Sequence, residues 1–133
     1  MGAWGMGIFD DDTSYDLIDE VMEGDAKSFL ENASSHKDSG YLEYEECHEV
    51  LVSGAILDAI SNGTTYGDSV EGFDAWISNQ STALVDSFRP QILEALNLII
   101  SEKSELNELW QENEDDYPTW KSNVNKVISR LSS

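Results

Sequence analysis

The sequence contains few basic residues and few histidines. Seven of its 133 residues are Lys or Arg and two are His, against 27 Asp and Glu, so the formal net charge is −20. A surface of this sign repels the phosphates of nucleic acids and of anionic membranes. It speeds the encounter with a positively charged protein instead. We therefore predict neither a nucleic-acid partner nor a membrane partner.

Three further absences bear on where the protein works. Cys47 is the single cysteine, which excludes an intramolecular disulfide and fits a reducing compartment. The longest apolar run, VLVSGAILDAI, has about half the length of a membrane span and contains Asp58. No secretory signal precedes the aspartates near the N-terminus. We expect a cytoplasmic protein.

Apolar residues, in contrast, are plentiful. They make up 40% of the chain, with four Trp, five Tyr and four Phe. A chain of this length is typical of one domain, so we predict a single helical domain over residues 1–133. Such a domain buries enough apolar surface to fold without a disulfide or a metal. We expect no cofactor.

The apolar residues recur at helical spacing along most of the chain. The segment from about residue 41 to 60 becomes apolar on all sides, which is typical of the central helix of a bundle. A short helix is expected in FDAWISNQ, after a loop rich in helix breakers at 61–72. The other predicted helices begin near Asp12 or Thr13, Asp25, Pro90, Ser104 and Pro118. We predict an all-α bundle of about six helices.

The N-terminal stretch MGAWGMGIFDDD combines glycines, apolar residues and three aspartates. A phosphate loop requires Lys and Ser or Thr after the glycines, and the aspartates repel phosphate. An EF-hand beginning at Asp10 would place Tyr15 where glycine is required and Val21 where a bidentate Glu is required. We predict a structural latch packed against the bundle, in which aromatic side chains fill gaps and aspartates cap the first helix. The latch residues are Gly2, Trp4, Gly5, Gly7, Phe9 and Asp12.

The same stretch resembles the start of a family of small bacterial proteins of unknown function. Its members begin M-G-A-W-G-x-G-x-F, followed by acidic or Asn residues. SELNELWQE, from Ser104 to Glu112, is similar to the Ser-Glu-Leu-x-x-Leu-Trp segment of that family. The resemblance implies a small helical protein and supplies no catalytic residues.

The few reactive residue types do not form a catalytic group. Cys47 and His48 are neighbours, but adjacent residues of a helix point in different directions, so we expect Cys47 to be a buried apolar residue. His36 falls in a polar segment that we predict to be a loop. Asp58 lies on an apolar helix and requires a partner, for which we propose Arg89. We predict that the protein is not an enzyme.

Two groups of acidic residues are candidates for binding a partner. One lies on the predicted central helix, and the other is an acidic run between aromatic residues. Such runs offer steering charge together with anchoring side chains, although an acidic surface also serves solubility alone. The candidate residues are Glu45, Glu46, Glu49, Glu112, Glu114, Asp115, Asp116 and Tyr117.

These observations lead to a binding protein as the first hypothesis. It would occlude a basic protein partner and be monomeric when free, and its concrete form is an immunity protein or antitoxin that neutralises a nuclease-type toxin. The alternative is a divalent-metal-binding protein or metal-dependent enzyme that uses the carboxylates of Asp10–Asp12 or of the central helix. A third possibility is an interaction module without a ligand.

Overall fold

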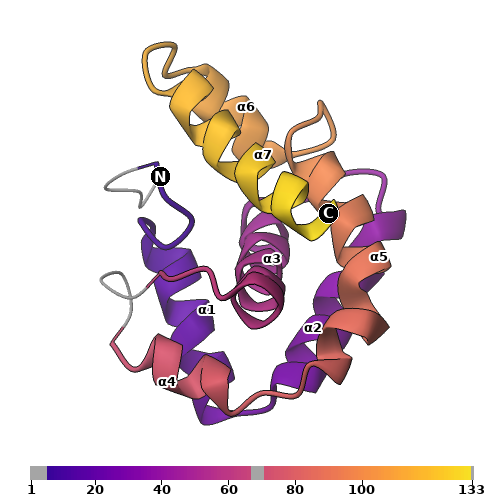
Figure 1. Ribbon diagram of the computed structural model, residues 1–133. Coiled ribbons are helices and arrows are strands. Elements are labelled where there is room, and N and C mark those ends of the chain that lie inside the picture. Colours follow the sequence, from indigo (N-terminus) through magenta and orange to yellow (C-terminus); the bar gives the residue numbers. More distant parts are fainter. Residues whose placement is uncertain (1–5, 67–70, 133) are drawn as a thin grey trace.

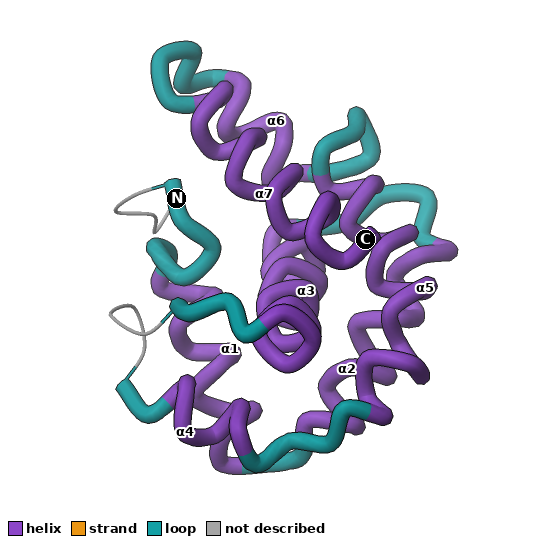
Figure 2. Tube along the Cα trace, viewed as in Figure 1, coloured by secondary structure: helices purple, strands orange, loops and turns teal. Residues whose placement is uncertain are grey.

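The protein is an all-α molecule in the computed structural model, which describes residues 6–66 and 71–132 (Figures 1 and 2). No strand occurs within these residues, and Leu42 and Ser104 form one isolated backbone bridge. The predicted fold class is confirmed, and the described residues form seven α-helices instead of about six. The helices are α1 (Asp12–Glu23), α2 (Ala26–Ser34), the 3-10 helix η1 (Ser35–Asp38), α3 (Tyr44–Asn62), α4 (Phe73–Ser78), α5 (Ala83–Ile99), α6 (Glu105–Gln111) and α7 (Tyr117–Ser132).

Helix α3 lies at the centre of the fold, as its apolar sequence predicts, and the other α-helices pack around it (Figure 1). All of its residues from Val50 to Ala59 are buried. At Gly54 the helices approach so closely that a Cβ atom would lie 3.1 Å from Leu96 Cδ1 and 3.3 Å from Val127 Cγ1. The glycine therefore allows α5 and α7 to pack directly on the backbone of α3. None of the described helices has the length and apolarity needed to cross a bilayer.

The prediction that a helix begins at Pro90 is wrong. Helix α5 begins at Ala83, and Pro90 lies inside it. Proline has no N–H, so the carbonyl of Asp86 lacks its helical hydrogen bond. Both residues are exposed, and water can reach this carbonyl. The apolar residues before and after Pro90 share one buried face, which holds the two halves together as a single helix.

The partner predicted for Asp58 is also wrong. The Asp58 side chain is fully buried and accepts hydrogen bonds from Arg130 Nε at 2.8 Å, Tyr66 Oη at 2.9 Å and Asn62 Nδ2 at 2.8 Å. Burial lowers the pKa of Arg130, but its hydrogen bonds and electrostatic attraction to Asp58 and Tyr66 together outweigh this effect, so the pKa is raised. Arg89 has a buried Nε without a hydrogen-bond partner among the described residues.

The described part of the N-terminal stretch, residues 6–11, packs against the bundle. Phe9 is 2% exposed, and its ring lies 5.4 Å from that of Tyr66 and 5.5 Å from that of Phe73. Asn123 of α7 donates a hydrogen bond to the Met6 carbonyl at 2.9 Å. The stretch thus connects α7 with the segment between α3 and α4.

Gly7 occupies a close contact within this stretch. Its N–H donates to Asp10 Oδ2 at 3.1 Å, and a Cβ atom at Gly7 would lie only 2.8 Å from the same oxygen. A larger residue at this position would therefore displace the Asp10 carboxylate that accepts the hydrogen bond. The predicted latch residues Gly2, Trp4 and Gly5 lie outside the described residues.

A candidate acidic binding surface

The exposed side of α1 carries only negative charge. Its sequence, DTSYDLIDEVME, has no basic residue. Leu17, Ile18 and Val21 are buried against the core, so the helical period directs the acidic residues to the opposite side. The exposed acids are Asp12, Asp16, Asp19, Glu20 and Glu23, which we call the α1 acidic face.

A groove of about 430 Å³ runs between α1 and the beginning of α3. Asp16 and Glu20 come from α1 and Glu45 from the first turn of α3, so the groove contains three carboxylates. No basic residue is among its described lining residues, and the remaining lining is formed by Thr13, Leu17 and Tyr44. Carboxylates gathered without a counter-charge favour a cation between them. We call this feature the α1–α3 groove.

A buried polar cluster positions Tyr44 at the edge of the groove. Asp11 is 4% exposed, and its carboxylate accepts hydrogen bonds from the backbone N–H of Thr13 at 2.8 Å and from the Tyr44 hydroxyl. An aspartate of the run caps α1, as predicted, but the cap is Asp11 and not Asp12 or Thr13. The backbone of Asp11 is extended, as a cap requires, whereas Asp12 is already the first helical residue and faces solvent.

His48 belongs to the same cluster and is 3% exposed. Its Nε2 lies 3.5 Å from Asp11 Oδ2, but neither ring nitrogen has a hydrogen bond within the described residues. Burial lowers the pKa of His48, and the attraction of Asp11 opposes this only in part. The imidazole is consequently neutral at pH 7 and adds no positive charge next to the groove.

The three glutamates predicted as one patch on α3 lie on two sides of it. Glu45 lines the α1–α3 groove, whereas Glu46 and Glu49 face His36. His36 Nε2 lies 2.9 Å from Glu49 Oε1, and Asn32 also donates to Glu49 at 2.9 Å. Residues three apart on a helix share a face and adjacent residues do not, which explains the division. His36 is buried in η1 and not in a polar loop, contrary to the prediction.

The second predicted patch, 112–117, connects α6 and α7 at one end of the molecule (Figure 1). Its acids are exposed apart from Asp116, which is half-buried and accepts a hydrogen bond from Asn113 at 3.0 Å. Tyr117 donates a hydrogen bond to Asn107 at 2.8 Å and stacks on Trp120. Tyr117 therefore links α7 to α6. These contacts leave its side chain less available to a partner than we predicted from the sequence.

Sequence reasoning placed Glu45 among the candidates but missed Asp16, Glu20 and Tyr44. A signal for the first two was present, because α1 contains five acids and no base. The approach of α1 to the first turn of α3 depends on helix packing, and no local pattern in the sequence reports it.

The aspartate run does not converge on one point. Asp10 accepts the N–H of Gly7, Asp11 is turned into the interior, and Asp12 is exposed. Across residues 6–66 and 71–132, no three His, Cys, Asp or Glu side chains are placed to hold a metal ion. Cys47 is fully buried, and burial raises the pKa of its thiol.

Comparison with known proteins adds one finding. A family model described as "Domain of unknown function (DUF4259)" matches residues 2–123, which include the opening motif and both sides of the α1–α3 groove. No curated protein and no solved structure matches the chain. Because the model spans most of the sequence, the chain belongs to this family of unknown function.

Proposed function

We propose that this protein is a binding protein whose acidic surface occludes a basic protein partner. Its most concrete form is an immunity protein or antitoxin that covers the positively charged substrate cleft of a nuclease toxin. The α1–α3 groove carries the proposal, because Asp16, Glu20 and Glu45 meet there and none of the described lining residues is basic.

The groove suits an Arg or Lys side chain of the partner. Its three carboxylates supply acceptors for a guanidinium or an ammonium, and Leu17 offers an apolar contact for the aliphatic stem. Close charge pairs at protein interfaces contribute about 1.5–7 kcal/mol of coupling energy, so one or two such pairs are enough to anchor a complex.

The remaining charge acts at longer range. The other three acids of the α1 acidic face, Asp12, Asp19 and Glu23, lie on the same helix as Asp16 and Glu20, and the whole chain carries a net charge of −20. A field of this size accelerates the approach of a basic protein and makes binding sensitive to salt. A nuclease presents such a basic cleft because it must bind phosphates. The metal-binding alternative has no comparable arrangement among the described residues.

The test compares charge reversal at the groove with charge reversal elsewhere. The wild-type protein is immobilised on a resin and exposed at low salt to a lysate of the cells from which it comes. A captured partner is identified, purified and tested for nuclease activity. Binding is then measured for D16K/E20K and for the control D86K/E94K. The control residues are exposed on α5, and both double variants change the net charge equally.

We expect one equivalent of the wild-type protein to abolish the partner's nuclease activity, and the dissociation constant to rise steeply with salt. D16K/E20K should weaken binding by about 100-fold, equivalent to about 2.7 kcal/mol. D86K/E94K should weaken binding less, because it lowers the net negative charge by the same amount but leaves the groove intact. A neutral or acidic partner, or equal losses in the two variants, would contradict the proposal.

A further inference from the structure

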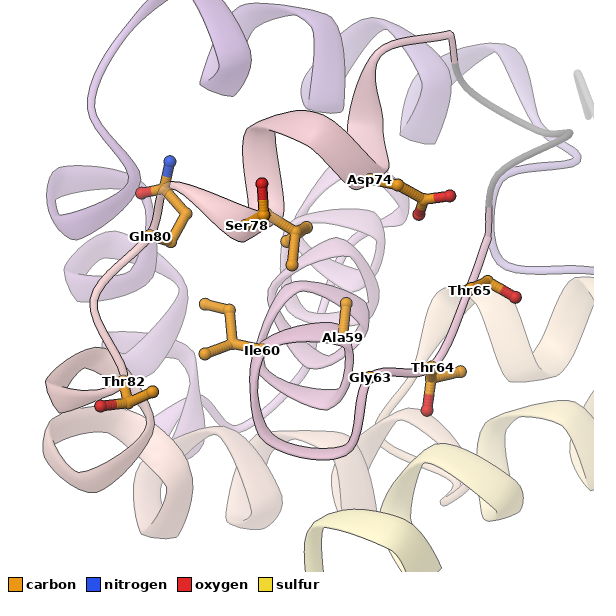
Figure 3. A pocket seen from close by; sticks show the side chains of 10 residues that line it. Ala59, Ile60, Gly63, Thr64, Thr65, Asp74, Ser78, Gln80 and Thr82 are labelled. Carbon is orange, nitrogen blue, oxygen red and sulfur yellow. The ribbon is translucent and has the colours of Figure 1, made fainter.

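A second depression of about 380 Å³ lies away from the α1–α3 groove, between the end of α3, α4 and the start of α5. Figure 3 shows Ala59 pointing from α3 toward α4 and Ile60 pointing toward the segment with Gln80 and Thr82, while Asp74 and Thr65 lie at the opposite end. Its volume falls in the range of small-molecule sites, about 300–1,000 Å³. We call it the α3–α4 pocket.

The lining of this pocket is mainly apolar and has one charge. Ala59, Ile60 and Ile77 supply the apolar surface. Asp74 is the only charged residue among the described residues that line it, and no described basic side chain forms an ion pair with its carboxylate. The remaining lining consists of hydroxyl and amide groups together with one glycine.

This lining is unsuited to three common classes of ligand. An anion would meet the Asp74 carboxylate and no basic residue. Calcium takes six to eight oxygen ligands and magnesium six, far more than one carboxylate offers. A flat nucleobase would find no aromatic ring to stack on among the described lining residues. A cation with an apolar body matches both the Asp74 carboxylate and the apolar surface of Ile60 and Ile77.

We propose that the α3–α4 pocket binds an unbranched aliphatic ammonium. The ammonium group pairs with Asp74, and the carbon chain lies on Ile60 and Ile77 toward Thr82. The net charge of −20 raises the concentration of cations around the pocket. The site is independent of the proposed function, because the pocket and the α1–α3 groove have no lining residue in common.

The test uses pentylamine as a free amine, blocked lysine as a protein side chain, and pentanol as a neutral control of similar length. Methyl and amide NMR shifts are followed at about 0.15 M NaCl, where distant charges are screened. We expect both amines, or one of them, to shift Ala59, Ile60 and Ile77 in a saturable manner, and pentanol to shift them much less. Binding of pentylamine alone indicates a free metabolite, and binding of blocked lysine alone indicates a protein side chain.

Variants separate this site from general attraction of counter-ions. D74N should weaken amine binding by about tenfold or more, which corresponds to the loss of a charged hydrogen bond. D86N, an exposed acid on α5, and the groove variant D16K/E20K should leave it nearly unchanged. Equal binding to D74N and wild type, shifts spread over the α1 acidic face, or no shift with either amine would overturn the inference.

Discussion

The clearest quantitative prediction concerns the buried pair of Asp58 and Arg130. In R130M the Asp58 carboxylate stays fully buried and keeps its hydrogen bonds from Tyr66 and Asn62, but it loses the one cation that the described residues pair with it. Methionine retains much of the apolar stem of arginine, so the main effect is electrostatic. We expect a large loss of stability without a change of fold.

The magnitude follows from burial. Removing one partner of a buried ion pair costs about 3–5 kcal/mol. The Arg130 side chain is 37% exposed, so water screens part of the interaction, and we lower the expectation to about 2–3 kcal/mol. For a domain of this size each kcal/mol shifts the melting temperature by about 3–5 °C, which gives a decrease of about 6–15 °C.

Urea unfolding followed by tryptophan fluorescence measures the effect, and two comparisons test its cause. R89M is the matched control, because Arg89 has no hydrogen bond from its buried Nε within the described residues, and we expect a loss below about 1 kcal/mol. In a D58N background the negative charge is gone, so R130M should cost less than about 1 kcal/mol there. Equal losses in R89M and R130M, or an undiminished loss in D58N, would refute the reasoning.

Three further predictions concern the interior. Burial lowers the pKa of His48 below its unfolded value of about 6.5, so below that pH the unfolded chain binds more protons than the folded one. The free energy of unfolding should therefore decrease as the pH falls below about 6.5, by at most about 1.4 kcal/mol per pH unit. Urea midpoints between pH 7 and 5 should show a smaller slope in H48F; an unchanged slope would contradict the assignment. G54A places a methyl group 3.1 Å from Leu96 and 3.3 Å from Val127. We expect the free energy of unfolding, measured in urea, to decrease by about 1–2 kcal/mol. An increase would show that the helices can move apart. The Cys47 thiol is fully buried with a raised pKa, so a thiol reagent should label it only after urea is added, and rapid labelling of the folded protein would contradict its burial.

Much of the fold was predictable because it depends on periodicity along the chain. The nearly all-round apolarity of residues 50–60 predicted the central position of α3, and Asp25 caps α2 as expected. Pro90 was misread because proline is common at helix starts, whereas the apolar face on both sides of it keeps α5 continuous. Burial of this apolar face outweighs the preference of proline for the start of a helix.

The candidate sites were less predictable. Adjacent acids on α3 were expected to act together, but Glu45 faces α1 while Glu46 and Glu49 bind His36. The α3–α4 pocket joins residues from α3 and α4 with the loop before α5, and no pattern along the chain indicated it. Both sites arise where helices distant in sequence meet.

By itself, the sequence determined the helical class, the central helix and the sign of the surface charge, because composition and helical period act locally and do not require knowledge of neighbours. The tertiary structure decided which charges are paired and which are free to act. It placed Arg130 and not Arg89 against Asp58, made Asp11 the cap of α1, and gathered Asp16, Glu20 and Glu45 in one groove. Such pairings depend on the packing of helices around α3, since electrostatic interactions follow distance in space and burial, and not distance along the chain.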